Sequence, residues 1–373
     1  MICIVLNSIG RGGAERSILL LAEELLRQGV PVQIVSLFNL PDEYPVPDAL
    51  RGKVVRLGSR SPLFALLRLR SHLGCLRPIA VFSLMSQANL ASALIGCLLG
   101  LPVLTSERTT PTLFYRSRFK QFLSLVPHTF SRRAVFISHY ALDHGLPNDA
   151  LGRIVRRNAC VLHNPVPCPV PTHLARESRR VRSLRLQLWA KGGAAGTEPL
   201  RLLIASRLVP GKGVLEFIES ARDELSSGSM ELTIAGVGPL LAPLQGLLQR
   251  QGLASQVHLL GFVDDIQTVY SSADVVVLTS ESEGFGRVGF EAYQAGCLVL
   301  GTPRNSFGDE LPTPTPAWKV VPQLAPLKPA LAALAASAVP ESGEDIDAMR
   351  EALSIEAHAR HFISIISTAV RHA

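Results

Sequence analysis

Short apolar runs along the chain alternate with longer segments in which apolar residues recur every three or four positions. The first run, Ile2–Leu6, is followed by a glycine-rich turn at 10–13, and a helical pattern comes next at 14–27. A second apolar run follows at Val32–Leu37. Strand, helix and strand in this order predict a βαβ unit, in which the two strands are parallel.

The same alternation continues and divides the chain into two α/β halves. Further strands of the first half are predicted at Val54–Leu57, Ile79–Ser83, Val103–Ser106, Ala134–Ser138 and Cys160–His163. The pattern starts again at 202 and continues to about 300, which predicts a second parallel sheet. Residues 1–165 and 199–354 are therefore expected to form two Rossmann-like domains. Between them, 166–198 is proline-rich at its start and Gly/Ala-rich at its end, which predicts a linker with a flexible insertion.

One apolar segment, Leu90–Leu104, could be mistaken for a membrane span. It is shorter than the roughly 18 to 20 residues that a span needs, and it contains Gly100 and Pro102. A buried helix that ends at Gly100, followed by a strand, explains it better. The chain is therefore predicted to be soluble or peripheral to a membrane.

The composition is that of a globular protein with substantial cores. The chain has 373 residues, of which 47% are hydrophobic and 18% charged, and this length allows two domains. Its six cysteines include no CxxC pair, so they indicate neither a zinc site nor a redox motif and favour a reducing compartment. The chain opens on a strand pattern rather than on a secretory leader, which predicts a cytoplasmic protein.

Positive charge is concentrated in the first half. Residues 1–171 contain 19 Lys and Arg against 9 Asp and Glu, whereas residues 197–373 contain 12 against 20. A basic half suits anionic lipid headgroups, a phosphate-bearing acceptor or nucleic acid. Nucleic acid is disfavoured, because no zinc-finger, RNP-type or helix-turn-helix signal accompanies the arginines. In 113–123 cations alternate with aromatic residues and leucines, which predicts either an interfacial helix on an anionic membrane or an ordinary surface helix.

Two acidic residues flank a glycine-rich turn after the predicted strand Ala273–Thr279. Glu283 lies in the turn, and Glu291 lies about one turn into the helix that follows. Carboxylates accept hydrogen bonds from paired hydroxyls, so Glu291 suits a ribose and Glu283 the hydroxyls of a sugar. Two solvated glutamates beside a helix would give the same pattern.

The turn itself suits a phosphate. Gly286 allows the backbone to come close to a ligand, and Arg287 and Val288 open the helix. The first N–H groups of a helix have no partner within it, and the positive end of the helix dipole lies there.

A second strand, loop and helix carries two cations. The strand Leu202–Ala205 is followed by a loop with Arg207 and Lys212, and these cations beside proline and glycine predict a diphosphate clamp. The P-loop spacing is absent, so the loop is not a Walker motif. Ordinary surface cations are the alternative.

These motifs, taken in order along the chain, resemble one family. Arg207 and Lys212, the Gly236-Val237-Gly238 turn, Gly261-Phe262 and the two glutamates are similar to the retaining glycosyltransferases of family 4. Gly12–Glu15 and Asn164–Val166 extend the similarity over most of the chain. The resemblance implies the GT-B fold, with two Rossmann-like parallel-sheet domains that face a cleft. It also implies that residues 355–373 form a helix that returns to the N-terminal, acceptor-side domain.

The resemblance implies transfer of a sugar, with retention, from a nucleoside diphosphate sugar to a hydroxyl of a glycan or lipid-linked acceptor in cell-surface polysaccharide or glycoconjugate synthesis. Ser106-Glu107-Arg108 resembles a motif of family members that build lipid-linked oligosaccharides, which favours a UDP-sugar such as a UDP-N-acetylhexosamine. That subset continues with Asn-Asp-Pro, whereas this chain has Thr109-Thr110-Pro111. A place on the inner face of the cytoplasmic membrane follows from such an acceptor.

The residue roles follow from the resemblance and the local patterns together. The residues expected at the reacting groups are Arg207, Lys212 and Glu283. Those expected to bind the donor are Gly12, Gly13, Phe262, Gly286, Arg287, Val288 and Glu291. On the acceptor side, we expect Glu107, Arg108 and His139, although a lone histidine is more often structural.

No metal or other cofactor is expected. The family manages its diphosphate without a DxD metal motif, and Asp264-Asp265 is read as the start of a helix before Ile266. Two alternatives stay open, a sugar-nucleotide epimerase or hydrolase of the same shape and a non-catalytic sugar-nucleotide-binding subunit, because a fold does not fix a reaction.

Overall fold

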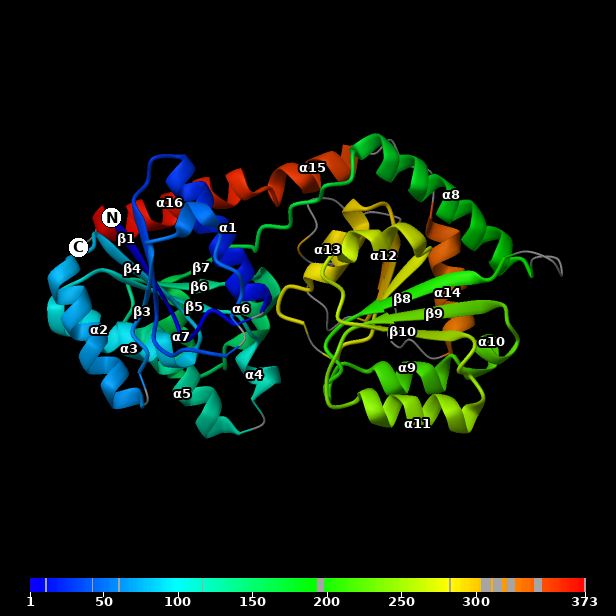
Figure 1. Cartoon of the computed structure of the whole chain (residues 1–373), viewed down its shortest axis with the longest axis horizontal. Coiled ribbons are helices and arrows are strands. Elements are labelled where there is room, and N and C mark those ends of the chain that lie inside the picture. The colour runs from blue at the N-terminus through cyan, green and yellow to red at the C-terminus, as the bar shows by residue number, and fades with distance from the viewer. Residues whose placement is uncertain are drawn as a thin grey trace. The chain divides into compact units, whose positions relative to one another are not determined.

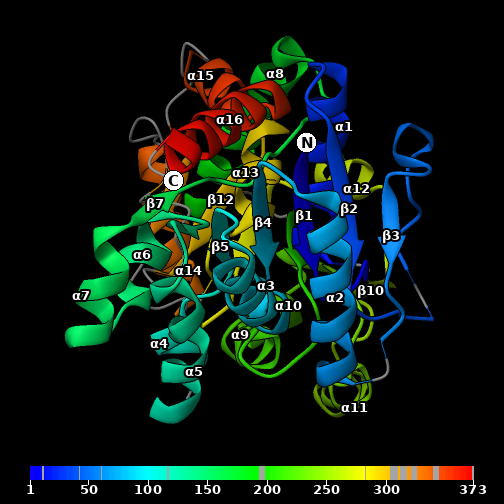
Figure 2. The ribbon, with the colours of Figure 1, turned by 90° about the vertical axis from the view of Figure 1, so that its left-hand side faces the viewer.

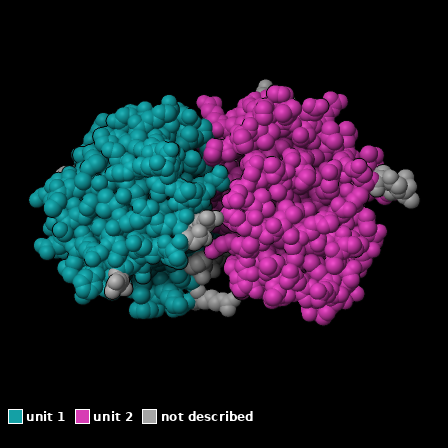
Figure 3. Space-filling model, viewed as in Figure 1, with its two compact units in different colours: residues 1–165, 353–373 teal, residues 166–352 magenta. Residues whose placement is uncertain are grey.

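The chain forms two compact units in a computed structural model (Figure 3). Unit 1 consists of Met1–Pro165 with Leu353–Ala373, and unit 2 of Val166–Ala352. The structure describes residues 1–10, 12–41, 43–59, 61–115, 117–192, 198–281, 283–302, 310, 317–320, 326–338 and 344–371.

Unit 1 is built on a seven-stranded parallel sheet with the order β3-β2-β1-β4-β5-β6-β7. Its strands are β1 (Ile2–Leu6), β2 (Val32–Ser36), β3 (Val54–Arg56), β4 (Ala80–Leu84), β5 (Val103–Glu107), β6 (Arg133–Phe136) and β7 (Ala159–Val161). The central strand β1 is buried at every residue, as its apolar run predicts for a parallel strand covered on both faces. The strand order reverses between β1 and β4, and ligands of open α/β sheets bind at the carboxyl ends of strands beside such a point.

Helices cover both faces of this sheet. They are η1 (Asp48–Leu50), α1 (Gly13–Arg27), α2 (Pro62–Leu76), α3 (Ser86–Leu99), α4 (Pro111–Phe114), α5 (Arg118–Thr129), α6 (His139–Gly145), α7 (Ala150–Arg157) and α16 (Ile355–Arg371). Figure 1 shows α1 and α16 on one side of the sheet and α2, α3 and α5 on the other. On the first side, the ring of Phe82 packs edge-on against that of Phe362, with centroids 5.0 Å apart. On the second side, Leu69 and Ile95 pack against Val81 and Val103.

Two sequence expectations for unit 1 are met and one is wrong. The apolar segment Leu90–Leu104 is a helix that ends at Gly100, in the left-handed region at φ 64°, followed by a strand. The segment 355–373 contains α16, which belongs to unit 1. The pattern at 113–123 is not one helix, because the backbone is extended at Tyr115 and α5 begins only at Arg118.

Unit 2 has a six-stranded parallel sheet with the order β10-β9-β8-β11-β12-β13. Its strands are β8 (Leu200–Ala205), β9 (Met230–Ala235), β10 (Val257–Gly261), β11 (Val275–Leu278), β12 (Leu298–Gly301) and β13 (Trp318–Val320). Its helices are α8 (Thr172–Ala190), α9 (Val214–Ser220), α10 (Arg222–Ser226), α11 (Leu241–Gln251), α12 (Ile266–Ser272), α13 (Arg287–Gln294), α14 (Leu327–Ser337) and α15 (Glu344–Ala352). The predicted α/β class with two parallel sheets is confirmed, and β8 and β11 lie side by side in the second sheet.

The segment 166–198, expected to be a linker, holds the 19-residue helix α8 and is part of unit 2. Two of its arginines are buried, not solvated. Arg179 donates to the carbonyl of Tyr293 at 2.5 Å and stacks on that ring, and Arg182 donates to the carbonyls of Tyr270 and Ala295 at 2.9 and 3.1 Å. These bonds satisfy carbonyls near the ends of α12 and α13, so α8 fastens both helices. The Gly/Ala stretch at 193–197 lies outside the described residues.

Within the described part of the chain, none of the helices combines the length and the apolar content that crossing a membrane requires.

Candidate functional site

The predicted site residues of unit 2 lie in the loops that follow β8 and β11. Because these strands are adjacent and parallel, their carboxyl ends deliver both loops to the same edge of the sheet. The loops are bonded to each other at two points. The hydroxyl of Thr279 donates to the carbonyl of Lys212 at 2.6 Å, and the amide of Glu281 donates to the carbonyl of Gly211 at 3.0 Å.

Lys212 and Glu283, predicted separately from sequence, are in direct contact. The Lys212 ammonium donates to Oε1 of Glu283, and the hydroxyl of Ser280 donates to the same oxygen at 2.8 Å. The two charged side chains are 18% and 27% exposed, so the pair is held by the loops and still open to a ligand. An anion that enters here can compete with Glu283 for the ammonium, and hydroxyls can donate to the carboxylate.

Gly213 allows this close approach of the two loops. Its φ is +65°, a conformation that glycine adopts without strain, and a Cβ at this position would lie 2.2 Å from the carbonyl oxygen of Thr279. Helix α9 begins directly after it.

The first turn of α13 supplies the predicted phosphate-binding end. Gly286 precedes the helix at φ +66°, and Arg287 and Val288 are its first two residues. The N–H groups of this turn point out of the helix at the positive end of its dipole, which favours an anion. The stacked rings of Phe285 and Phe290, 4.6 Å apart and buried, fix the turn onto the sheet.

Glu291 is held on both carboxylate oxygens. The Arg287 guanidinium donates to Oε1 at 2.8 Å, and the Tyr270 hydroxyl donates to Oε2 at 3.0 Å. Burial, together with the negative charge of Glu291, raises the pKa of Tyr270 well above its ordinary value, so the phenol stays protonated and remains a donor. With its rotamer fixed by two donors, the carboxylate keeps lone pairs for the hydroxyls of a ribose.

We expect Tyr270→Phe to raise the KM for the donor about three- to tenfold and to leave kcat within about twofold, because the net worth of one hydrogen bond is typically about 0.5–1.5 kcal/mol and Arg287 still holds the other carboxylate oxygen. The measurement is steady-state kinetics with the donor varied. The control is Tyr293→Phe, which removes a hydroxyl from an equally buried tyrosine of unit 2. An unchanged KM together with a lower thermal midpoint would assign Tyr270 a purely structural role.

Arg207 and Phe262, the other predicted residues of unit 2, lie on exposed loops after β8 and β10. The β8 loop is fastened to the Gly236-Val237-Gly238 turn, because the amide of Leu208 donates to the carbonyl of Val237 at 2.9 Å. The turn is tied to the loop of Phe262, because the amide of Gly236 donates to the carbonyl of Gly261 at 2.7 Å. The loops that follow β8, β9 and β10 are thus joined to one another by backbone hydrogen bonds.

Asp265 caps α12. The sequence predicts a helix start at the pair Asp264-Asp265, in agreement with this position. The Asp265 side chain accepts from the amide of Gln267 at 3.2 Å. This geometry is that of an N-cap residue.

In unit 1, the predicted donor-side residues Gly12 and Gly13 lie at the start of α1. Gly12 precedes the helix, and the Glu15 carboxylate folds back over it, so that a Cβ on Gly12 would lie 2.2 Å from Oε2 of Glu15. A buried carboxylate at the third helical position favours the helix N-terminus electrostatically. A side chain at position 12 would therefore displace the Glu15 carboxylate from this position.

Glu107, predicted on the acceptor side, is 8% exposed and engaged inside unit 1. Its Oε1 accepts from the amide and the hydroxyl of Thr109 at 2.9 and 2.6 Å, and its Oε2 lies 3.6 Å from Nε2 of His128. The other ring nitrogen of the fully buried His128 lies 2.7 Å from the hydroxyl of Thr105. The Glu107 carboxylate is therefore held by Thr109 and lies beside the buried ring of His128, a residue that no local pattern in the sequence marks.

Arg108 lies beside the end of β5, and its Nη1 donates to Oδ1 of Asn164 at 2.6 Å. Burial lowers the pKa of Arg108 to about 10, although the nearby charges of Glu107 and Glu15 oppose the shift. Burial and the charge of Arg108 lower the pKa of His358, on α16, to about 3, so this histidine is neutral. His139 is exposed at the start of α6, and its ring lies edge-on to that of His163 at 5.6 Å.

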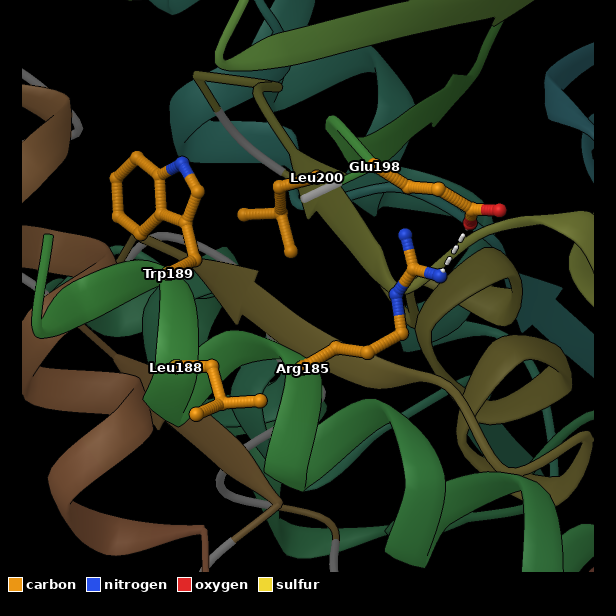
Figure 4. A pocket seen from close by; sticks show the side chains of 5 residues that line it. All are labelled: Arg185, Leu188, Trp189, Glu198 and Leu200. Carbon is orange, nitrogen blue, oxygen red and sulfur yellow. Dashed lines mark hydrogen bonds and ion pairs between the residues drawn. The ribbon is translucent and has the colours of Figure 1, made fainter. Parts of the chain in front are cut away.

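A cavity of about 190 Å³ lies at the opposite edge of the sheet of unit 2, lined by Arg185, Leu188, Trp189, Glu198 and Leu200 (Figure 4). Leu200 is the first residue of β8 and marks the amino end of the strand, whereas Arg207 lies in the loop after its carboxyl end. Figure 4 shows the guanidinium of Arg185 turned to the carboxylate of Glu198, to which it donates at 2.8 Å. The cavity is separate from the loops that carry the candidate site.

Comparison with known proteins finds a family and a relative that each match part of the chain. Residues 188–311 match the family of glycosyl transferases group 1. A relative named "Uncharacterized glycosyltransferase MJ1607", from Methanocaldococcus jannaschii, is 38% identical over 101 residues. That match covers 26% of this chain and 26% of the relative, so it spans about a quarter of the relative's length.

Solved structures resemble the whole chain in fold. Anabaena Alr3699/HepE in complex with UDP has a TM-score of 0.71 and 16% identity, over 98% of this chain and 99% of that one. Sucrose-phosphate synthase from Thermosynechococcus elongatus has a TM-score of 0.75 and 15% identity, over all of both chains.

The chain therefore has the GT-B fold, and its residues 188–311 are similar to the group 1 glycosyl transferases. The matched region contains Arg207, Lys212, Phe262, Glu283, Arg287 and Glu291.

Proposed function

We propose that this protein is a glycosyltransferase that uses a nucleoside diphosphate sugar as its donor. The observation that carries the proposal is the contact between Lys212 and Glu283. The start of α13 at Gly286 and the carboxylate of Glu291, which we assign to a ribose, belong to the same edge of the sheet of unit 2. A cation and a helix N-terminus suit a diphosphate. The two carboxylates suit the hydroxyls of a sugar and of a ribose.

In the proposed reaction, the bond between the anomeric carbon and the diphosphate breaks while the acceptor hydroxyl adds to the same face. Because the new bond forms on the face that the diphosphate leaves, the configuration is retained. The acceptor proton passes to the departing diphosphate. Negative charge grows on the diphosphate, and Lys212, Arg207 and the first N–H groups of α13 stabilise it. Glu283 orients the sugar and Glu291 the ribose. We propose that no metal is needed, and activity is expected to persist in excess EDTA.

The acceptor we propose is a hydroxyl of a glycan or lipid-linked saccharide, in polysaccharide or glycoconjugate synthesis. Ser106-Glu107-Arg108 supports it through its resemblance to enzymes of lipid-linked oligosaccharides, and a UDP-sugar, including a UDP-N-acetylhexosamine, is the first donor to test. The basic first half of the chain supports peripheral contact with an anionic membrane on its cytoplasmic face.

A thermal-shift screen of UDP-, GDP- and ADP-sugars tests the donor site. A donor that binds the native state at 100 times its Kd stabilises it by about 2.7 kcal/mol, so the true donor raises the midpoint. Glu291→Ala should blunt that shift, whereas Glu198→Ala, at the opposite edge of unit 2, should preserve it. If no nucleotide sugar shifts the midpoint of the wild-type protein, the donor-site assignment fails.

Product analysis distinguishes transfer from the alternatives. A transferase forms a glycosylated acceptor and free nucleoside diphosphate only when an acceptor is present. A hydrolase or epimerase would convert the donor without one, and a binding subunit would leave it unchanged in both cases.

A further inference from the structure

The layer of helices α2, α3 and α5 in unit 1 has an unusual outer side. The inner sides of α2 and α3 pack on the sheet through Ala65, Leu69 and Leu73 and through Ala88, Ala91 and Ile95. Figure 2 shows α2, α3 and α5 together on the side of the sheet away from α1 and α16, with α3 between the other two. Their outer sides should carry polar residues if they faced only water.

Helix α3 instead shows an apolar outer side with no charge. Leu90, Leu94 and Leu98 follow one another at four-residue spacing and are 46%, 45% and 71% exposed, with exposed Cys97 beside them. The 14 residues of α3 include no Asp, Glu, Lys or Arg. Its outer stripe is therefore as apolar as a buried one.

Helices α5 and α2 extend this stripe on both sides. On α5, Phe119, Phe122 and Leu123 are 68%, 50% and 51% exposed, whereas the residues turned inward include the buried Ser124 and His128. On α2, Leu63, Phe64 and Leu67 are 64%, 59% and 54% exposed. We call these nine side chains on α2, α3 and α5 the outer apolar face. Exposed apolar side chains gathered in this number on three neighbouring helices indicate an interaction site.

The charges on the helices that carry the outer apolar face have one sign. The helices α2 and α5 carry Arg68, Arg70, Arg118 and Lys120 and no acidic residue. Between Pro62 and Phe130 the sequence has a single acidic residue, Glu107, which is buried. Arginine and lysine can extend their charged ends to lipid phosphates while their stems cover apolar surface.

This combination favours a bilayer over a second copy of the chain. A symmetric dimer would bring two identical basic faces together, so their like charges would oppose the apolar contact. An anionic bilayer supplies hydrocarbon for the leucines and phenylalanines and negative charge for Arg70, Arg118 and Lys120. Arg68 is bonded to the carbonyls of Leu57 and Gly58 and is left out of this count.

We propose that the outer apolar face of α2, α3 and α5 is the surface by which this protein inserts into the interface of an anionic lipid bilayer. The inference rests on the proposed function, because it specifies how the basic first half of the chain binds a membrane that contains the lipid-linked acceptor. Its evidence, the exposed side chains and their charges, is independent of the donor site.

The test is co-sedimentation of the full chain with vesicles of phosphatidylcholine alone and of phosphatidylcholine with phosphatidylglycerol, at about 0.1 M and about 0.5 M salt. We expect binding to the anionic vesicles, and weaker binding at the higher salt. Leu94→Glu with Phe122→Glu should lower the partition coefficient by about tenfold or more, because both apolar contact and charge balance are lost. Arg118→Ala and Lys120→Ala should each lower it by about fivefold.

The matched control is Ile154→Glu with Val181→Glu. These side chains, on α7 and α8, are 48% and 51% exposed, against 45% and 50% for Leu94 and Phe122. The control should bind vesicles like the wild type, and both double variants should keep the thermal shift with the nucleotide sugar that stabilises the wild type.

Three results would overturn the proposal. They are a wild-type protein that sediments with neither vesicle or equally with both, a Leu94→Glu/Phe122→Glu variant that binds like the wild type, and a dimer in light scattering that this variant abolishes without any vesicle binding. Sugar transfer to a soluble acceptor is measured in a separate assay. If no transfer is detected, the proposed function fails, but the result of the vesicle-binding test still stands.

Discussion

Lys212→Ala is expected to lower kcat by on the order of 10²–10³-fold, the loss that accompanies removal of one preorganised group from a developing anion. The Lys212 ammonium lies between two loops and is directed by its contact with Glu283 and by the bond from Thr279 to its own carbonyl. Its charge is therefore in place before the diphosphate begins to leave. The measurement is kcat under saturating donor.

Two controls isolate the role of this charge. Lys191→Ala removes an exposed lysine of unit 2 and should leave kcat unchanged. In Lys212→Ala, Glu283 also loses its cation, so the double variant Lys212→Ala with Glu283→Ala is needed. If the double variant regains activity over Lys212→Ala, the lysine serves only to neutralise Glu283, and its assigned role at the diphosphate is wrong.

Much of the fold could be predicted, because a buried parallel strand leaves a strong mark in sequence. The run Ile2–Leu6 is apolar at every position because helices cover both faces of its sheet, and the predicted boundaries coincide with β1. Gly100 marks the end of α3 because only glycine adopts its positive φ without strain. These are local causes, which a local pattern can report.

The parts that could not be predicted depend on contacts between distant segments. The arginines of α8 look like a solvated linker, yet Arg179 and Arg182 are buried because they bond carbonyls about 90 to 115 residues away. The break near Tyr115 has no proline or glycine at the break itself to announce it.

Contacts between distant segments also explain why only part of the candidate site could be predicted from the sequence. Glu283 and Glu291 could be identified from the turn and the helix around them, but their partners lie elsewhere in the chain. Tyr270 is 21 residues before Glu291, and its position in a short helix resembles that of any core aromatic. His128 lies in a basic, apolar helix whose pattern indicates a surface, and only the fold places its ring beside Glu107.

We expect Gly236→Ala to lower the free energy of unfolding by about 3 kcal/mol or more, because the new methyl group overpacks a site without room to move. A Cβ at Gly236 would lie 1.8 Å from the carbonyl oxygen of Ser206, a backbone atom that cannot turn aside as the end of a side chain can. The clash would push the β9 turn from the β8 loop that carries Arg207 and Lys212, so transfer should fall with stability.

Chemical denaturation and kcat/KM with the donor give the two measurements. Gly252→Ala is the matched control, because Gly252 has φ +69° with no heavy atom within 4 Å of the added Cβ, so it should cost about 1 kcal/mol of backbone strain and leave activity intact. If both variants lost the same small amount, the contact at Gly236 would be relaxed by a shift of the turn. The tight approach of β8 and β9 would then contribute nothing to placing the cations.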